Sequence, residues 1–398
     1  MEFVICFALI VILIRLKVPV GVTLLITAGL LSFLEFGISR EFIAPFQRTL
    51  VDLRTWHLIA TIILVITLSE VLSRAGFLER MVNALNSYIS PRAVAKIAPA
   101  LIGLLPMPGG AMVSAPIIEE LARGSSISAE TKTTANYWWR HIWEPVWPLY
   151  QSVILAAAIL GISVWQVAGI CFPITIAFIV AGTFLIKLPL RGHDNKKAKF
   201  AKFSAEMTYS LWPVIFIVMT GFILHIDLVI SLLILFVILL ASKATAVRII
   251  FGSLKKEFSF DVILLFFGGL SLMQVIETGR AAENTLASLH AWGVPADLIV
   301  FTLPFLVGLL TGLTAAYVGV GFPIVSSAFA LTGGLGSGIL LAYAGGLMGI
   351  MLSPVHLCLV LTKKYFAAGF KGIYQQLMPV VLLAALLVFL TRYLFYRG

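Results

Sequence analysis

Charged side chains are scarce in this sequence of 398 residues. Asp, Glu, Lys and Arg make up 12% of the chain, whereas hydrophobic residues make up 60%. The mean hydropathy is +1.05. A chain with so few charges cannot cover a water-soluble globule, so the composition excludes a soluble protein and indicates a polytopic membrane protein. Its length suits about ten membrane spans joined by short loops.

Cysteine is also scarce, and the motifs of common enzyme classes are missing. Cys6, Cys171 and Cys358 all lie inside apolar runs, so we expect no disulfide framework. The chain has no nucleotide-binding loop, no HExxH and no CxxC. The net charge of +10 does not indicate a nucleic acid partner, because the basic residues lie in loops between apolar runs. We therefore expect a protein that is not an enzyme and has no cofactor besides a coupling ion.

Apolar runs of about twenty residues divide the chain into two similar halves. The first half, 1–190, and the second half, 207–398, flank a basic linker at 191–206. The expected segments are 1–14, 19–36, 55–73, 97–122, 133–160 and 164–186, followed by 207–225, 228–242, 259–277, 297–330, 338–362 and 374–392. Each half thus has five spans and one interrupted segment. Because five is odd, the halves begin on opposite sides of the membrane, which predicts an all-α fold with two inverted-topology repeats.

Segments 97–122 and 297–330 contain residues that do not suit a membrane helix. The first contains LPMPGG and the second contains TGLTAAYVGVG, and both open with Pro-x-x-x-Gly-Leu-Leu. Proline removes a backbone donor and glycine loosens the chain, so such backbone is tolerated at membrane depth only inside protein or beside a cavity. We expect two re-entrant helical hairpins whose tips meet near the midplane. Paired interruptions of this kind are typical of transporter binding sites.

Spans 133–160 and 338–362 are each expected to break at a proline. In the first, WEPVW places Glu144 directly before Pro145, and Arg140 stands four residues earlier. On a continuous helix Arg140 and Glu144 would share a face and neutralise each other. The proline would leave backbone carbonyls free to bind Na⁺ beside Glu144, and Glu144 could instead carry a proton. The alternative places Arg140 at the interface, where long basic side chains reach for water.

The LPMPGGAMVSAP hairpin and the WEPVW break resemble an uncharacterised integral-membrane family of unknown function within the ion transporter superfamily. This superfamily includes dicarboxylate, citrate, gluconate, lactate and arsenite permeases, and the resemblance covers nearly the whole chain. It implies ion-coupled secondary transport with elevator-like motion of the hairpins against a scaffold. The Pro-Met-Pro-Gly-Gly tip departs from the Ser-Asn-Thr tips of the dicarboxylate carriers, which argues against a dicarboxylate substrate.

Two groups of candidate site residues follow from the interrupted segments and from this resemblance. The expected substrate-binding residues are Pro108, Gly109, Gly110, Ser114, Arg140, His141, Thr311, Thr314, Ser353 and His356. The expected ion-coupling residues are Glu144, Pro145, Gly312, Gly319, Gly321 and Pro354. Hydroxyls, a guanidinium, imidazoles and half-helix N-termini are donors that an anion would need at this depth. The glycines could equally serve helix packing, and either histidine could simply be hydrogen-bonded in the core.

The distribution of basic residues predicts the orientation of the chain. With the N-terminus outside, 21 of the 28 Lys and Arg residues face the cytoplasm, six face outward and Arg140 lies within a span. We therefore expect a multi-pass protein of the plasma membrane with both termini outside and the linker 191–206 in the cytoplasm. Its partners would be the lipid bilayer and a small solute, and a homodimer is compatible with the sequence. An ion exchanger, an uncoupled channel, a membrane enzyme and an assembly factor are the alternative functions.

Overall fold

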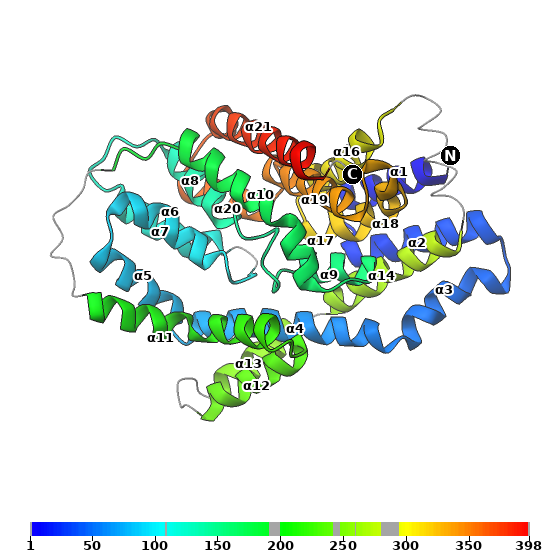
Figure 1. Ribbon diagram of the computed structural model, residues 1–398, viewed down its shortest axis with the longest axis horizontal. Helices are drawn as coiled ribbons and strands as arrows, with labels where there is room; N and C mark the ends of the chain where they lie inside the picture. Colours follow the sequence, from blue (N-terminus) through cyan, green and yellow to red (C-terminus); the bar gives the residue numbers. More distant parts are fainter. Residues whose placement is uncertain are drawn as a thin grey trace.

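The fold is built from helices. A computed structural model describes residues 2–107, 110–190, 200–241, 247–258, 260–279 and 294–396, and within these ranges it has helices and no strand. Within the part of the chain that the structure describes, six helical segments are long and apolar enough to cross a membrane: Leu53–Arg74, Val164–Leu185, Phe200–Ile223, Phe260–Thr278, Thr314–Thr332 and Phe370–Phe395. The helices and their hydrophobicity agree with the prediction of an all-helical membrane protein (Figure 1).

Most helices lie in or near the predicted segments. The first half contains α1 (Glu2–Arg15), α2 (Val20–Phe36), α3 (Arg40–Val51), α4 (Leu53–Arg74), α5 (Phe77–Tyr88), α6 (Pro91–Ile102), α7 (Ala111–Leu121), α8 (Ala129–Arg140), α9 (Gln151–Leu160) and α10 (Val164–Leu185). The second half contains α11 (Phe200–Val218), η1 (Met219–Ile223), α12 (Leu228–Ala241), α13 (Val247–Glu257), α14 (Phe260–Thr278), α16 (Ala296–Thr311), α17 (Thr314–Ala316), η2 (Tyr317–Gly321), α18 (Phe322–Val325), η3 (Ser326–Thr332), α19 (Leu335–Met351), α20 (Leu357–Tyr365) and α21 (Phe370–Phe395).

Three helices, α3, α5 and α13, occupy stretches between the predicted segments. They are short and amphipathic, so a window sized for a membrane span averages their apolar face with their polar face. In α5, for example, Phe77, Met81 and Leu85 are buried at a spacing of four residues. A search for long apolar runs therefore misses such helices.

The helical path is interrupted at four sites that contain proline or glycine, two in each half of the chain. Helix α6 ends at Ile102 and α7 begins at Ala111, and helix α16 ends at Thr311 just before Gly312. Beyond Gly312 the chain continues through α17, the π-helix η2, α18 and the 3₁₀-helix η3. The other two interruptions separate α8 from α9 and α19 from α20.

Glycines allow helices of the second half to approach one another closely. Helix α16 packs along α19, and a Cβ at Gly345 or Gly349 would strike the carbonyl oxygens of Phe301 and Phe305 on α16. Gly308 on α16 likewise faces the carbonyl oxygen of Gly346. Close contacts through small residues are the usual way in which membrane helices associate.

The helix that follows each break packs against the other half of the chain. Helix α9 of the first half contacts α17 and η2, whereas α20 of the second half contacts α7 and α8. In Figure 1 the α6–α7 pair lies on the left and the α16–α18 region on the right, with α9 and α20 between them. Each half therefore contributes to the packing around the interruptions of the other.

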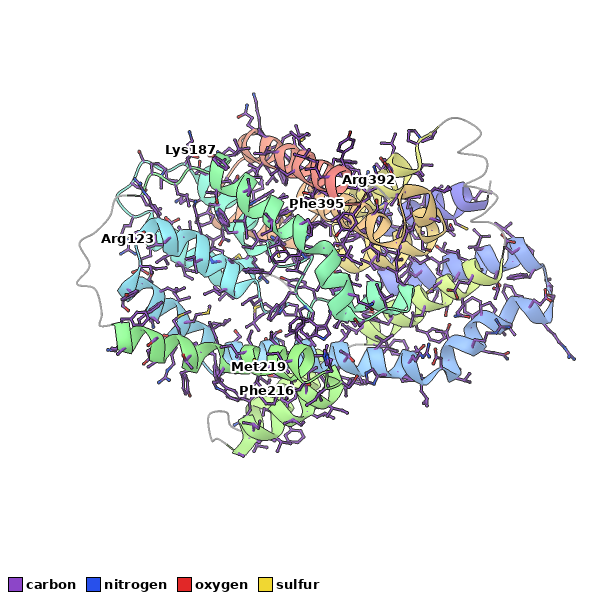
Figure 2. All side chains as sticks on the ribbon, in the orientation of Figure 1. Arg123, Lys187, Phe216, Met219, Arg392 and Phe395 are labelled. Atoms are coloured by element: carbon purple, nitrogen blue, oxygen red, sulfur yellow. The ribbon has the colours of Figure 1, made fainter. Side chains whose placement is uncertain are left out.

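Apolar side chains cover much of the outer surface of the described residues. Met219 and Phe395 are 46% and 76% exposed, as expected for side chains in contact with lipid (Figure 2). Exposed Arg123 and Lys187 lie toward the left end in Figure 2, and Arg392 lies farther to the right.

Candidate functional site

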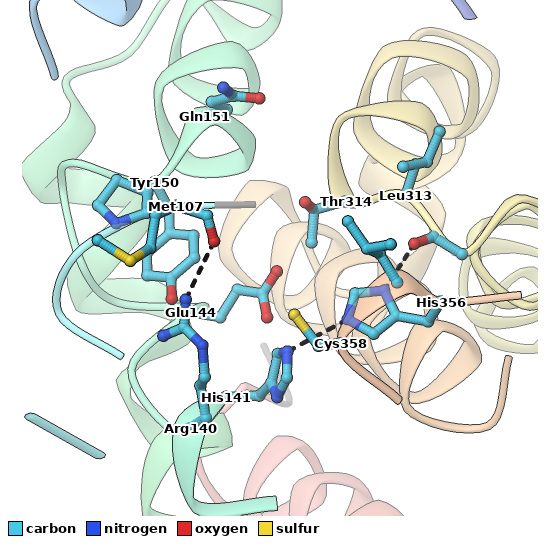
Figure 3. Close-up of a pocket in the computed structure, with 13 residues that line it drawn as sticks. Met107, Arg140, His141, Glu144, Tyr150, Gln151, Leu313, Thr314, His356 and Cys358 are labelled. Atoms are coloured by element: carbon cyan, nitrogen blue, oxygen red, sulfur yellow. Dashed lines mark hydrogen bonds between the residues drawn. The ribbon is translucent and has the colours of Figure 1, made fainter. Parts of the chain in front are cut away.

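A small cavity lies where the interruptions of the two halves meet. Its volume is about 190 Å³, and Figure 3 shows the side chains that line it. The lining residues are Pro106, Met107, Arg140, His141, Glu144, Tyr150 and Gln151 from the first half, and Gly312, Leu313, Thr314, His356, Leu357 and Cys358 from the second. The cavity thus suits a small solute and brings together groups far apart in the sequence.

Arg140 is fixed by the loop that follows α6. Its Nη1 donates to the carbonyl of Ile102 at 3.1 Å, and its Nη2 donates to the carbonyls of Leu105 at 3.4 Å and Met107 at 3.2 Å. A Cβ at Gly110 would strike the guanidinium, so a larger residue there would displace it from its present position. Arg140, which is 3% exposed, therefore caps the C-terminal end of α6 while its charge lines the cavity.

The expected pairing of Arg140 with Glu144 is not seen. Helix α8 ends at Arg140, so the four-residue spacing no longer places the two side chains on one helical face. The guanidinium is directed at the loop carbonyls, and the carboxylate of Glu144 points into the cavity (Figure 3). The positive and the negative charge therefore remain separately available to ligands.

Glu144 is a buried carboxylate with an unused acceptor. The side chain is 3% exposed, and its Oε2 has no hydrogen-bond partner among the described residues. The carbonyls that the sequence predicts to be free beside it are engaged. Glu144 donates its backbone N–H to the carbonyl of His141 at 3.3 Å, and the hydroxyl of Tyr343 donates to the carbonyl of Glu144 at 3.3 Å. The backbone carbonyls thus already have partners, whereas the carboxylate oxygen has none and is the group that could bind a cation.

His141 and His356 meet on the opposite wall of the cavity. Their Nε2 atoms are 3.2 Å apart, and their Nδ1 atoms lie 2.6 Å from the carbonyl oxygens of Tyr137 and Gly312, respectively. The ring of Tyr137 packs edge-on against His141, with 4.7 Å between ring centroids. Both imidazoles are therefore held in fixed orientations by carbonyls behind them.

Gly312 shapes the second-half side of the site. It has a left-handed backbone with φ +64°, and a Cβ would lie 2.7 Å from the backbone nitrogen of His356. Thr314, the first residue of α17, also lines the cavity. Of the predicted site residues, the structure therefore gathers Arg140, His141, Glu144, Gly312, Thr314 and His356 around one space.

The other predicted residues do not line this cavity. Pro108 and Gly109 lie outside the described residues. Three buried hydroxyls bond locally: Ser114 donates to the carbonyl of Ala111, Thr311 accepts from the backbone of Leu313, and Ser353 accepts from the backbone of Val355. The remaining members, Gly110, Pro145, Gly319, Gly321 and Pro354, contact protein or lie in turns; a Cβ at Gly319 would meet Leu24 and Leu155, and one at Gly321 would meet Pro304.

Three polar or reactive lining residues were missed from the sequence, namely Tyr150, Gln151 and Cys358. The hydroxyl of Tyr150 donates to the carbonyl of Gly103 at 2.6 Å, which ties the end of the first-half break to the α6 loop. Cys358 looks like an ordinary residue of an apolar run. Its position two residues after His356 was the available signal, because such a spacing can bring both side chains to one site.

A second, larger cavity of about 520 Å³ lies between the start of α4, the end of α9 and α14. Its charged residues, which include Arg48, Arg54 and Glu277, are exposed. None of these three side chains is buried, so the cavity encloses no buried charge among them that would need a ligand. The smaller cavity, with its buried charges, is the stronger candidate.

A family model described as "Protein of unknown function (DUF401)" matches residues 2–395. The chain belongs to this family. The match agrees with the predicted membership of an uncharacterised family, and the wider resemblance to the ion transporter superfamily stays a prediction. No curated protein matches the chain. The DUF401 description assigns no activity, so the function has to be inferred from the cavity itself.

Proposed function

We propose that this protein is a secondary active transporter that uses a cation gradient to move a small organic anion across the plasma membrane. The observation that carries the proposal is the carboxylate of Glu144, buried in a small cavity with an oxygen that has no partner among the described residues. An ionisable group at membrane depth is costly, and a carboxylate there marks an ion pathway. Na⁺ or H⁺ bound at Glu144 would remove that cost.

Arg140 supports an anionic substrate. The guanidinium reaches the same cavity, and its hydrogen bonds go to neutral carbonyls, which leaves its positive charge without a neutralising carboxylate in those contacts. An anion in this space would find that charge together with the hydroxyl of Thr314. A cation at Glu144 and an anion beside Arg140 would load the cavity together, which is the arrangement that symport requires.

The packing of the two halves supports a mechanism based on inverted repeats. Helices α9 and α20, each following a break, pack against the hairpin region of the other half. We propose that α6–α7 and the segment from α16 to η3 are the re-entrant hairpins of two inverted repeats and that they move together against the remaining helices. Broken helices that meet at a midplane site are the usual basis of alternating access. With this architecture the chain would resemble the ion transporter superfamily.

Uptake into proteoliposomes tests the proposal. The wild-type protein should accumulate a labelled small carboxylate in a saturable way, and accumulation should disappear when the Na⁺ and H⁺ gradients are removed. Glu144→Gln should lose accumulation but keep the chromatographic behaviour of the wild type, and Glu120→Gln, at an exposed site on α7, is the matched control. Unaltered gradient dependence in Glu144→Gln would refute the coupling role. Non-saturating currents would indicate a channel, and a chemically altered solute would indicate an enzyme.

A further inference from the structure

A cluster of three side chains on one wall of the cavity is not explained by cation-coupled transport of an anion. His141, His356 and Cys358 each offer one ligand atom, and these atoms lie within 4.8 Å of one another. The three side chains are buried, at 4%, 9% and 7% exposure. They come from two sequence regions more than two hundred residues apart, and in Figure 3 they converge on one point.

The hydrogen bonds behind the histidines define what these rings present to each other. A carbonyl oxygen can only accept, so the 2.6 Å contacts with Tyr137 and Gly312 place a hydrogen on Nδ1 of each ring. In a neutral imidazole the Nε2 atom then carries a lone pair. The two Nε2 lone pairs face each other across 3.2 Å, with no donor hydrogen between them. Facing lone pairs repel each other, and a positive species held between the rings would remove that repulsion.

The distances suit a tetrahedral metal ion. Two imidazole nitrogens bound to one Zn²⁺ at 2.0–2.1 Å with a tetrahedral angle lie about 3.3 Å apart. The observed separation of 3.2 Å agrees with this value. Metal-bound histidines also typically donate their second ring nitrogen to a carbonyl or carboxylate, which fixes the tautomer in advance. Both histidines already make this contact.

The chemistry of the three ligands selects the class of metal. Two imidazoles and a thiolate are borderline to soft ligands that suit Zn²⁺ and its close relatives, whereas Na⁺, Mg²⁺ and Ca²⁺ prefer oxygen. We propose that His141, His356 and Cys358 form a binding site for one Zn²⁺-type transition-metal ion. The ion joins the break after α8 to the start of α20, and its fourth position faces the cavity.

Metal binding by the purified full-length protein tests this site without any transport assay. After treatment with a chelator and dialysis against Zn²⁺, the wild type should retain one ion per chain, and X-ray absorption should show one sulfur and two imidazole ligands. With Co²⁺, a sulfur-to-cobalt charge-transfer band should appear in the near ultraviolet. Cys358→Ser should remove this band. Loss of a residue that only hydrogen-bonds to a metal ligand weakens metal binding by roughly 10- to 100-fold, and loss of the ligand Cys358 itself should weaken Zn²⁺ binding by more than that.

Cys171→Ala is the matched control, because Cys171 is also buried but lies within α10 and is not one of the three clustered ligands. It should leave the band unchanged. The site is refuted if no metal is retained, as expected were a proton alone to bridge the rings, or if absorption shows only oxygen and nitrogen ligands. The X-ray absorption measurement uses the wild type, so it tests the site even if the Cys358→Ser protein does not fold. Loss of uptake with intact metal binding would contradict the transport proposal alone.

Discussion

The Nε2 atoms of His141 and His356 lie 3.2 Å apart, although 215 residues separate them in the chain. His141 follows the last residue of α8, and His356 precedes the first residue of α20. The two rings therefore mark the point at which the broken helices of the two halves meet. The candidate site belongs to neither half alone.

Arg140→Gln should weaken both stability and anion binding. The substitution removes the donors to the carbonyls of Ile102, Leu105 and Met107, and leaving a buried polar group unsatisfied costs about 1–3 kcal/mol. Thermal unfolding in detergent should show a lower melting temperature. It should also show loss of the dose-dependent shift that the proposed function predicts for the wild type with a carboxylate.

Arg123→Gln is the control for charge alone, because Arg123 is exposed. It should change neither the melting temperature nor the carboxylate shift appreciably. If carboxylates stabilise the Arg140→Gln variant as well as they stabilise the wild type, the guanidinium does not contact the anion.

Gly312→Ala should destabilise the protein more than Gly161→Ala. Both glycines end a helix in a left-handed conformation, with φ +64° and φ +65°. The left-handed strain of about 1–2 kcal/mol is therefore common to the two variants. Only the Cβ at Gly312 would also press on the backbone of His356, which should add about 1–3 kcal/mol. Equal melting temperatures for the two variants would show that the contact between Gly312 and His356 relaxes without cost.

The orientation of the chain can be measured with introduced cysteines. Arg123→Cys and Ile38→Cys both place a thiol at an exposed position, and the native cysteines are buried. An impermeant maleimide added to whole cells should label Cys at position 38 but not at position 123, and inside-out vesicles should give the reverse. Labelling of both positions from the same side would overturn the predicted topology.

The contact between Glu130 and Gly369 predicts a small pH effect. Gly369 donates its backbone N–H to Oε1 of Glu130 at 3.1 Å, and this hydrogen bond holds the pKa of the carboxyl below its usual value. The native state thus favours the ionised carboxylate. The resulting stability is present above the unfolded pKa of about 4.3 and is lost as the pH falls through the folded pKa. Glu130→Gln should flatten the melting temperature between about pH 5 and pH 3, and Glu120→Gln should not.

Proline and glycine predict the interruptions of the helical path from the sequence alone. The clusters at LPMPGG and TGLTAAYVGVG lie where helices α6 and α16 end, and the prolines at 145 and 354 lie between helices. Both residue types act through the backbone itself, so their effect is local and visible in a short stretch of sequence. The same breaks make Arg140, Glu144 and His356 candidates for the site, since polar groups at such positions need partners.

Features that depend on loop geometry could not be predicted. The i, i+4 rule paired Arg140 with Glu144 only on the assumption that the helix continues, and the early end of α8 instead directs the guanidinium to the α6 loop. Cys358 resembles the other buried cysteines until the fold of the second break brings it beside His356 and His141. Such neighbours are set by contacts across two hundred residues, which no local pattern records.

The reciprocal packing of α9 and α20 has a consequence for how the protein is made. Ribosomes add about 5–20 residues per second, so about 10–40 s pass between the synthesis of His141 and that of His356. During this interval Arg140 and Glu144 have been synthesised, but the helices that later enclose them have not. During biosynthesis the charged side chains of Arg140 and Glu144 therefore pass through a stage in which only water or the insertion machinery can solvate them. A chain truncated before α20 would be held at that stage and exposed to quality-control proteases.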